Sequence, residues 1–167
     1  QGFLKLANVP FVGAGVLGSA VGMDKDVQKR LLRDAKISIA NFIVLTNLYP
    51  LAPVPSPYPI FVKPANLGSS VGINKAHNRE ELLTFIAEAS AYDRKVLVEK
   101  GIEGVREIEC AVLGNQEVKA SLPGEIIPSN EFYDYDAKYV DGKSDAKIPA
   151  DLPADIIKTV QDTAISA

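Results

Sequence analysis

Cysteine and histidine are almost absent from this sequence, which contains one of each among its 167 residues. A single cysteine, Cys110, excludes an internal disulfide framework and is typical of a reducing compartment. A single histidine, His77, excludes histidine-rich metal sites and argues against a serine–histidine catalytic triad. We expect Cys110 to be buried and unreactive within an apolar, strand-like run, and His77 to be solvated in a polar turn.

Long apolar runs and an excess of positive charge are also missing. No apolar segment is long enough to span a bilayer, and no signal peptide is recognisable. The net charge of −3 gives no support to binding of nucleic acid or of an anionic membrane. Hydrophobic content of 47% with 23% charged residues is instead typical of a soluble globular protein. The length suits one ordinary core or parts of two small domains.

The stretch from Pro59 to Lys75 is the most informative part of the chain. It predicts a short apolar strand that ends in Lys63 and Pro64, then a glycine–serine loop, then a second short strand. A fixed lysine beside backbone N–H groups and hydroxyls fits a cradle for polyphosphate. The same residues fit a glycine-rich hairpin with a surface lysine equally well. The spacing of glycine and lysine is not that of a Walker loop.

A second glycine-rich run, Gly13–Gly18, matches the dinucleotide-binding fingerprint and follows a predicted buried strand at Val9–Val12. A dinucleotide fold then needs a second strand that ends in an acid. The next segment, 24–36, is instead patterned as a charged amphipathic helix, and the strand after it, Phe42–Leu45, ends without an acid. The sequence therefore favours glycines that ease a tight turn.

The other elements are predicted from hydrophobic periodicity and turn residues. In chain order they are a helix end at 1–6, a stiff proline-rich connector at 49–59, a helix at 80–92, a strand at 95–100, a glycine break at 101–106, a strand at 107–113, a hairpin turn at 114–115 into a strand at 117–120, a long polar-aromatic loop at 123–145 and a helix at 153–167. A loop of that length is usually a lid or disordered.

Several polar residues recur at points that suit a nucleotide site between two sheets. Lys63 and its loop are followed, one strand–helix–strand later, by Glu99 and Lys100, and then by Glu107 after the glycine break. An extended linker pairs its backbone with the adenine edge, and a carboxylate accepts hydrogen bonds from ribose hydroxyls. Taken singly, each acid is an ordinary strand-edge residue and each lysine a solvated one.

Four stretches together resemble the D-alanine–D-alanine ligases of the ATP-grasp superfamily. They are GAGVLGSAVGMDK, FVKPANLGSSVG, VLVEKGIEGVREIECAVLG and EFYDYDAKYVDG, and they cover nearly the whole chain. The resemblance implies an α/β to α+β, ATP-grasp fold with its nucleotide site between two sheets. It also implies three parts: a remnant of an N-terminal Rossmann-like substrate domain at 1–23, a central small domain at 24–100, and a partial C-terminal domain at 101–167 that includes the family's ω-loop.

The resemblance assigns roles to matching residues. Lys25, Lys63 and Lys138 correspond to lysines that contact the phosphates, Glu107 to the ribose-binding glutamate, and Tyr139 to an ω-loop tyrosine that shares a hydrogen-bond network with Ser69. Residues implied to contact ATP are Lys25, Lys63, Gly68, Ser69, Ser70, Val71, Glu99, Lys100, Ile102, Glu107 and Lys138. Residues implied in catalysis are Lys138, Tyr139 and Ser69. A tyrosine at 139 resembles the dipeptide-forming members more than the depsipeptide-forming, vancomycin-resistance relatives.

The implied reaction has two steps in the cytoplasm. ATP phosphorylates the carboxylate of one D-alanine, and the amine of a second displaces phosphate to give the dipeptide used in peptidoglycan precursors. The partners implied are D-alanine, ATP and, in the full-length protein, a second copy as a homodimer, with no nucleic acid and no membrane.

Two parts of the family pattern have no counterpart in this sequence: the N-terminal substrate-binding glutamate, and the later arginine and Mg²⁺ ligands. No metal ligand is therefore assigned, and we expect these 167 residues alone not to catalyse ligation. The alternatives are another ATP-grasp carboxylate–amine ligase, a non-catalytic nucleotide-binding fragment, and a dinucleotide-binding oxidoreductase domain.

Overall fold

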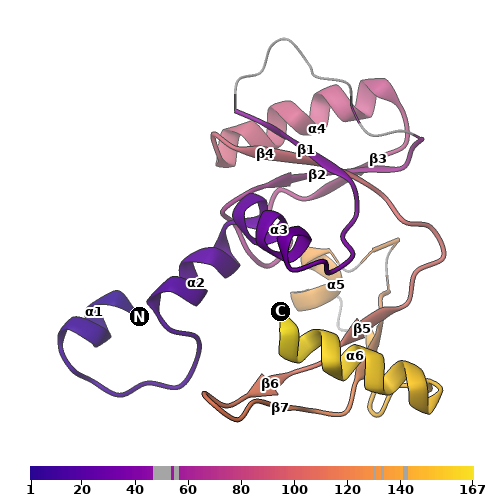
Figure 1. The fold of residues 1–167 in the computed structure, drawn as a ribbon. Coiled ribbons are helices and arrows are strands. Elements are labelled where there is room, and N and C mark those ends of the chain that lie inside the picture. Colours follow the sequence, from indigo (N-terminus) through magenta and orange to yellow (C-terminus); the bar gives the residue numbers. More distant parts are fainter. Residues whose placement is uncertain (47–53, 55–56, 130, 133, 141–142) are drawn as a thin grey trace. The chain divides into compact units, whose positions relative to one another are not determined.

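The computed structural model divides the chain into two compact units, Gln1–Gly101 and Ile102–Ala167 (Figure 1). The structure describes residues 1–46, 54, 57–129, 131–132, 134–140 and 143–167. The proline-rich connector predicted at 49–59 lies outside the described residues, apart from 54 and 57–59. None of the described helices is long and apolar enough to cross a membrane.

The first unit is built on a four-stranded antiparallel sheet. Its strands are β1 (Phe42–Leu45), β2 (Ile60–Pro64), β3 (Asn74–Ala76) and β4 (Val96–Lys100), in the order β1-β4-β2-β3. Strands β2 and β4, which carry Lys63 and Glu99, thus pair directly, with Phe61 opposite Glu99 and Lys63 opposite Leu97. Because side chains alternate along a strand, this register gives the sheet two different faces.

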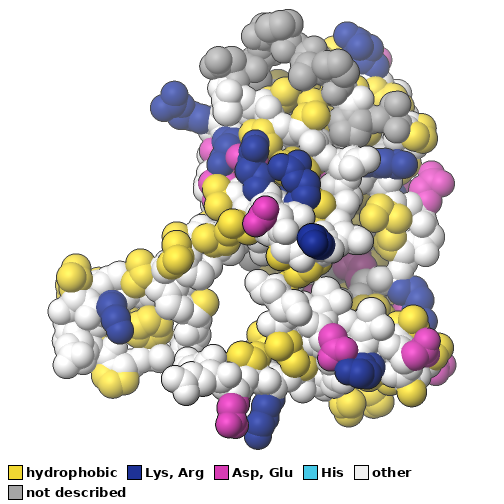
Figure 2. All heavy atoms as spheres, viewed as in Figure 1, with side chains coloured by type: hydrophobic (Ala, Val, Ile, Leu, Met, Phe, Trp, Pro, Cys, Tyr) yellow, Lys and Arg dark blue, Asp and Glu magenta, His cyan; other side chains and the backbone are white. Residues whose placement is uncertain are grey.

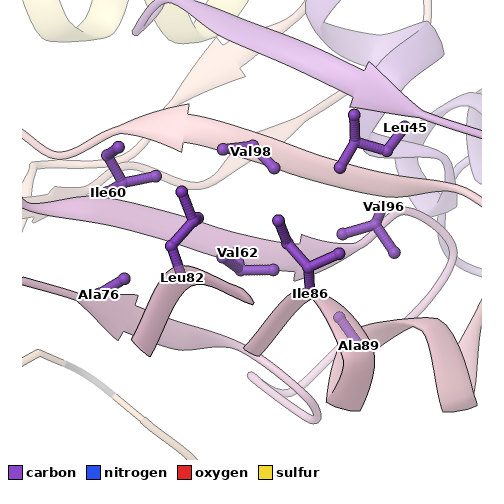
Figure 3. Close-up of a cluster of buried hydrophobic side chains, with 9 residues drawn as sticks. All are labelled: Leu45, Ile60, Val62, Ala76, Leu82, Ile86, Ala89, Val96 and Val98. Atoms are coloured by element: carbon purple, nitrogen blue, oxygen red, sulfur yellow. The ribbon is translucent and has the colours of Figure 1, made fainter. Parts of the chain in front are cut away.

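One face of this sheet is apolar and packs against helix α4 (Arg79–Tyr92) (Figure 3). The strand residues on this face include Ile60, Val62, Val96 and Val98, all fully buried. The helix contributes Leu82, Ile86 and Ala89, whose spacing of four and three residues places them on one helical face. Asn78 caps the helix by accepting a hydrogen bond from the Glu81 N–H at 2.9 Å. The predicted helix at 80–92 is confirmed.

The opposite face carries Phe42, Glu99, Phe61 and Lys63, because these residues alternate with the core residues along β1, β4 and β2. Helix α3 (Lys25–Asp34) lies on this side, across the sheet from α4 (Figure 1). The charged amphipathic helix predicted at 24–36 is confirmed, with Asp24 as its N-cap.

Two short helices precede α3: α1 (Gly2–Leu6) and α2 (Val16–Met23). The strand predicted at Val9–Val12 is wrong, since these residues form a loop between the helices and Val12 is 94% exposed. Strand residues need a partner strand, and Pro10 also lacks a backbone donor. The Gly13–Gly18 run therefore lacks the preceding strand of a dinucleotide site. Its glycines serve the turn, with φ at +128° for Gly13 and Gly15 as the N-cap of α2.

The second unit contains a three-stranded antiparallel sheet and a separate hairpin. The sheet runs in the order β5-β8-β9, from β5 (Glu107–Glu109), β8 (Gly124–Ile127) and β9 (Asp145–Lys147), and the hairpin joins β6 (Val112–Leu113) to β7 (Lys119–Ala120). Its helices are α5 (Tyr135–Tyr139) and α6 (Ala154–Ser166). Gln161 on α6 donates a hydrogen bond to the Ser121 carbonyl at 2.9 Å, which anchors α6 beside the hairpin.

Two predictions for the second unit need correction. The strand predicted at 107–113 is broken at Cys110–Ala111, where the Ser121 hydroxyl accepts a hydrogen bond from the Ala111 N–H at 3.0 Å in place of a strand neighbour. Cys110 is therefore half-buried rather than buried. The loop predicted at 123–145 contains β8 and α5. The predicted turn after Leu113 is confirmed: Gly114 has φ of +143°, and a Cβ there would lie 2.1 Å from the Glu117 carbonyl oxygen.

Candidate functional site

The start of α3 fixes Lys25 against the glycine–serine loop. Asp24 caps the helix through its Oδ1, which accepts hydrogen bonds from the N–H groups of Asp26 and Val27 at 3.1 and 3.2 Å. The Lys25 N–H donates to the Ala65 carbonyl at 3.0 Å, and the Lys25 ammonium donates to the Leu67 carbonyl. Both ends of this lysine are thus bound to the segment that leads from β2 into the loop.

Lys63 lies on the polar face of β2 and brings a second ammonium group towards Lys25. Burial lowers the pKa of Lys25, and the positive charge of Lys63 lowers it further. The Lys63 Nζ lies 3.1 Å from Glu99 Oε1 and 5.1 Å from the centre of the Phe61 ring. Two converging lysines favour an anionic ligand. Figure 2 shows that Lys and Arg side chains gather around α3 on the face in view.

The loop that these lysines flank is tightly folded. Ser69 and Ser70 have φ of 53° and 58°, in the left-handed region that is unfavourable for residues other than glycine. The Val71 N–H donates to the Gly68 carbonyl at 3.1 Å, and the Ile73 N–H donates to the Ser70 carbonyl at 3.2 Å. The loop therefore provides hydrogen-bond partners for some of its own backbone N–H and carbonyl groups.

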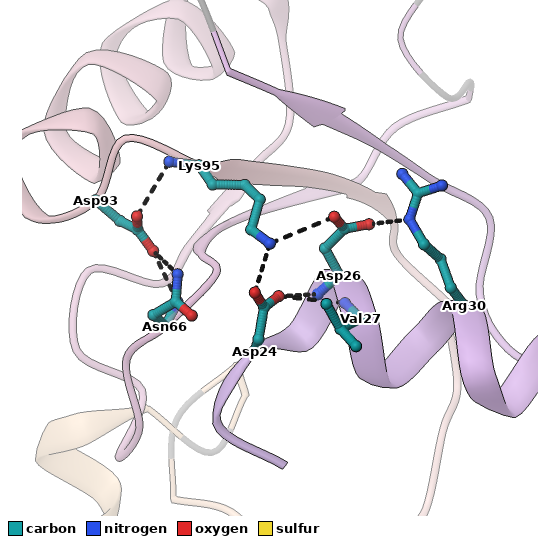
Figure 4. A network of polar contacts seen from close by, with 7 residues as sticks. All are labelled: Asp24, Asp26, Val27, Arg30, Asn66, Asp93 and Lys95. Carbon is teal, nitrogen blue, oxygen red and sulfur yellow. Dashed lines mark hydrogen bonds and ion pairs between the residues drawn. The ribbon is translucent and has the colours of Figure 1, made fainter. Parts of the chain in front are cut away.

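A polar network joins the loop, α3 and the start of β4 (Figure 4). Lys95 Nζ lies 2.5 Å from Asp24 Oδ2 and 3.4 Å from Asp26 Oδ2. Asp93 Oδ2 accepts hydrogen bonds from both the backbone N–H and the side-chain amide of Asn66, at 2.7 and 2.9 Å. The Lys95 N–H donates to the other Asp93 oxygen at 3.1 Å. The loop and α3 are thus both joined to the start of β4.

The pKa values in this network follow the pairing. Burial opposes charge on Asp24, but its hydrogen bond with Lys95 and those from Val27 and Asp26 outweigh it and lower the Asp24 pKa. Burial likewise opposes charge on Lys95, yet its contacts with Asp24 and Asp26 raise the Lys95 pKa. Lys95, Asp93 and Asn66 were not predicted as site residues, because no local sequence pattern indicates contacts between residues that lie far apart in the chain.

Glu99 sits between two lysines. Its Oε2 lies 2.9 Å from Lys29 Nζ, and its Oε1 is the atom that faces Lys63. Its position on β4, paired with β1 on one side and β2 on the other, makes it a central rather than an edge residue. Lys29 was also missed, although its place one helical turn after Lys25 is a signal that puts both lysines on one face.

The remaining predicted site residues occupy the end of β4 and the second unit. The Lys100 N–H donates to the Asn41 carbonyl at 2.8 Å, and Gly101 next to it is buried with its N–H on the Pro59 carbonyl at 2.8 Å. In the second unit, Ile102 is 59% exposed and Glu107 is half-buried on β5 opposite Ile126. Whether Ile102 and Glu107 contact the same ligand as Lys25 and Lys63 stays a prediction.

Helix α5 carries Lys138 and Tyr139, the predicted ω-loop residues. Asp134 begins the helix by accepting a hydrogen bond from the Ala137 N–H at 2.8 Å. The Ser144 hydroxyl donates to the Ala137 carbonyl at 2.9 Å and lies 3.2 Å from the Ser129 N–H, so both sides of the loop are joined. The rings of Tyr135 and Tyr139 pack with centroids 5.1 Å apart. The predicted hydrogen-bond network between Tyr139 and Ser69 stays a prediction.

The part of the chain that the structure describes does not form a metal site. Its His, Cys, Asp and Glu side chains form no group of three or more that could hold a metal ion. The described residues therefore do not fit Mg²⁺ by themselves.

Comparison with known proteins identifies the relatives of this chain. It is 53% identical over 158 residues to the D-alanine--D-alanine ligase of Solibacter usitatus (strain Ellin6076), covering 93% of this chain and 48% of the relative. It is 52% identical over 175 residues to the D-alanine--D-alanine ligase of Shouchella clausii (strain KSM-K16), covering 100% of this chain and 47% of the relative. The chain thus spans about half the length of the curated relatives it matches.

Solved structures show the same relationship. The VanG D-Ala:D-Ser ligase from Enterococcus faecalis aligns with a TM-score of 0.82 at 35% identity, over 99% of this chain and 50% of that one. The D-alanine-D-alanine ligase from Coxiella burnetii aligns with a TM-score of 0.78 at 36% identity, over 99% and 44%. The predicted ATP-grasp fold is confirmed. Residues 53–167 match the family model described as "D-ala D-ala ligase C-terminus", and the chain belongs to the D-alanine–D-alanine ligase family.

Proposed function

We propose that this protein ligates two D-alanine molecules to D-alanyl-D-alanine at the expense of ATP, for peptidoglycan precursor synthesis in the cytoplasm. The observation that carries the proposal is the hydrogen bond of the Lys25 ammonium to the Leu67 carbonyl in the loop at 66–72, with Lys63 on the strand that leads into this loop, in a chain of this family. Two ammonium groups beside a loop of small residues suit a polyphosphate, whose transfer needs charge neutralisation and positioning.

Each of the proposed site residues has a separate role. Lys25 and Lys63 bind the phosphates, and the loop with Gly68, Ser69, Ser70 and Val71 covers them. Lys100 and the Ile102 backbone bind adenine together with Glu99, and Glu107 accepts hydrogen bonds from the ribose. Lys138 approaches the phosphates, and Tyr139 with Ser69 closes the site. Closure excludes water, which protects the acylphosphate of the first D-alanine until the second amine attacks.

The domain assignment is part of the same proposal. Residues 1–23 belong to the substrate-binding domain, 24–100 to the small nucleotide-binding domain, and 101–167 to the larger one. The phosphoryl donor is ATP with Mg²⁺, and the full-length enzyme is a homodimer.

The test is phosphate release by the purified full-length protein. Release should require both ATP and D-alanine, should yield D-alanyl-D-alanine by mass spectrometry, and should be absent with L-alanine. Lys63→Met should reduce kcat/KM for ATP by at least about tenfold, because it removes one of two phosphate-facing charges. Lys158→Met, on the exposed face of α6, is the matched control and should leave turnover unchanged. Release that other amino acids support equally would refute the D-alanine assignment.

A second substrate is favoured by one observation. The structural neighbour with a TM-score of 0.82 is named a D-Ala:D-Ser ligase. D-serine should therefore be offered with D-alanine in the same assay. We expect D-alanyl-D-alanine to dominate, because the relatives at 53% and 52% identity are named D-alanine--D-alanine ligases, whereas the D-Ala:D-Ser ligase is 35% identical. A product mixture dominated by D-alanyl-D-serine would reverse that choice.

A further inference from the structure

Lys29 is a nearly buried lysine for which neither the motifs nor the proposed function provides a role. It lies on α3 one helical turn after Lys25, and 14% of its side chain is exposed. Its Nζ lies 2.9 Å from Glu99 Oε2 and 5.3 Å from the centre of the Phe42 ring. Lysine is among the residues least often buried, so a lysine held in this way indicates a specific task.

Glu99 is shared evenly between Lys29 and Lys63. Each carboxylate oxygen accepts one ammonium group, at 2.9 Å and 3.1 Å, and 12% of the Glu99 side chain is exposed. The strand register places Phe42, Glu99 and Phe61 in one row across β1, β4 and β2. The two lysines therefore reach the carboxylate from opposite sides, one from a helix and one from a strand.

The charges decide what this arrangement does. If Lys63 were its only partner, Glu99 would form a neutral ion pair with it. A nearly buried carboxylate with a single partner would hold that partner firmly. With Lys29 present, two ammonium groups contact one carboxylate, which leaves an excess of positive charge for a ligand. When Lys63 turns towards a phosphate, Glu99 keeps its ion pair with Lys29 and is not left unpaired.

We propose that Lys29 is a positioning residue of the nucleotide site, which holds Glu99 so that Lys63 is available to the polyphosphate. The inference rests on the proposed function, because it assumes that Lys63 contacts the phosphates of ATP. It adds to that function a residue that need not touch the nucleotide. Its effect should therefore depend on the phosphates and should disappear with the charge of Glu99.

The experiment measures binding of a non-hydrolysable ATP analogue and of adenosine to the full-length protein by calorimetry. Lys29→Met should weaken binding of the ATP analogue about tenfold, through the loss of Lys63 to Glu99, and should change adenosine binding less than about twofold. Lys29→Arg keeps the charge and should stay within about threefold of the parent. Arg33→Met, on an exposed part of the same helix, is the matched control and should bind both ligands like the parent.

A double variant separates positioning from a merely structural role. In a Glu99→Gln background Lys63 is no longer captured, so adding Lys29→Met to Glu99→Gln should change binding of the ATP analogue by less than about threefold. The inference is overturned if Lys29→Met binds the analogue as tightly as the parent, if adenosine binding falls equally, or if Lys29→Met weakens binding as much in the Glu99→Gln background as in the parent. If the parent protein binds the analogue no better than adenosine, the phosphate site itself fails, and with it the proposed function.

Discussion

Lys25 is held at the candidate site by both its backbone and its side chain. Its N–H and its ammonium both donate to the segment between β2 and the loop, at the Ala65 and Leu67 carbonyls. Asp24 caps the helix that begins at Lys25, by accepting hydrogen bonds from the N–H groups of Asp26 and Val27. The lowered pKa of Lys25 reflects burial and the charge of Lys63, and an anionic ligand beside both would reverse that effect.

Gly72 is a residue that the loop requires for steric reasons. Its φ is +68°, and a Cβ there would lie 2.9 Å from both Pro64 Cγ and Tyr92 Cδ2. Gly72→Ala should therefore lower the free energy of unfolding by about 2–3 kcal/mol, from backbone strain and overpacking together. Urea denaturation followed by circular dichroism measures the change.

Gly68 is the matched control in the same loop. A Cβ at Gly68 would meet nothing within 4 Å, and its φ is not in the left-handed region. Gly68→Ala should therefore leave the free energy of unfolding within about 0.5 kcal/mol of the parent. Equal losses for the two alanine variants would contradict the steric account of Gly72.

At the scale of elements, the link between the loop and β4 makes a prediction about pH. Burial raises the pKa of Asp93, but hydrogen bonds from the Lys95 N–H and from Asn66 outweigh it and hold the pKa below its ordinary value of 3.8. The folded state thus favours the charged carboxylate. Its contribution to stability is fully present above pH 3.8, and it is lost as the pH falls through the lower folded pKa.

Asp93→Asn should therefore reduce the free energy of unfolding by about 1 kcal/mol at pH 7, a figure reduced for solvent exposure. The difference from the parent should shrink below pH 3.8 as the parent carboxylate becomes protonated. Denaturant titrations at several pH values measure this. Asp34→Asn, at the exposed end of α3, is the control and should show a much smaller difference. A loss for Asp93→Asn that is independent of pH would count against the carboxylate's charge as its cause.

Elements with strong local signals were predicted, whereas those that depend on partners were not. Helix α4 was predicted because its apolar periodicity is a local signal. The strand at Val9–Val12 was predicted from local preference alone, and these residues pair with none of the described strands. The continuous strand predicted at 107–113 is divided because its first part pairs with β8 and its last part with β7. Helix α5 was missed because five residues carry little periodicity, and its cap and its Ser144 tie come from outside it.

The same division applies to the site. Lys25 and Lys63 were predicted because they occur in recognisable motifs. The pairing of Glu99 with Lys29 joins a strand to a helix, and the pairing of Asp24 with Lys95 spans 71 residues. Neither pair can be recognised from the local sequence, because each contact depends on the register of the sheet and on the position of the helix together. The motifs proposed to contact the ligand could thus be recognised in the sequence, but the residues that hold them in place could not.

At the scale of the whole molecule, the main apolar core belongs to the first unit alone. The cluster that includes Ile60, Val62, Val98 and Ile86 lies within Gln1–Gly101. The buried apolar residues described in the second unit are few and small, such as Ala137 and Ala150. Amides of β2 and β4 should therefore exchange with deuterium most slowly, because they open only when this core unfolds.

Ile86→Ala tests whether this core governs the whole chain or only its first unit. The side chain is 4% exposed, so the substitution should cost about 2–5 kcal/mol through lost burial and a residual cavity. We expect hydrogen–deuterium exchange to accelerate in β1–β4 and α4, while residues 102–167 keep the rates of the parent. Leu83→Ala, on the more exposed side of the same helix, should accelerate exchange far less. Equal acceleration in both units would contradict this expectation and would mean that they unfold as one cooperative block.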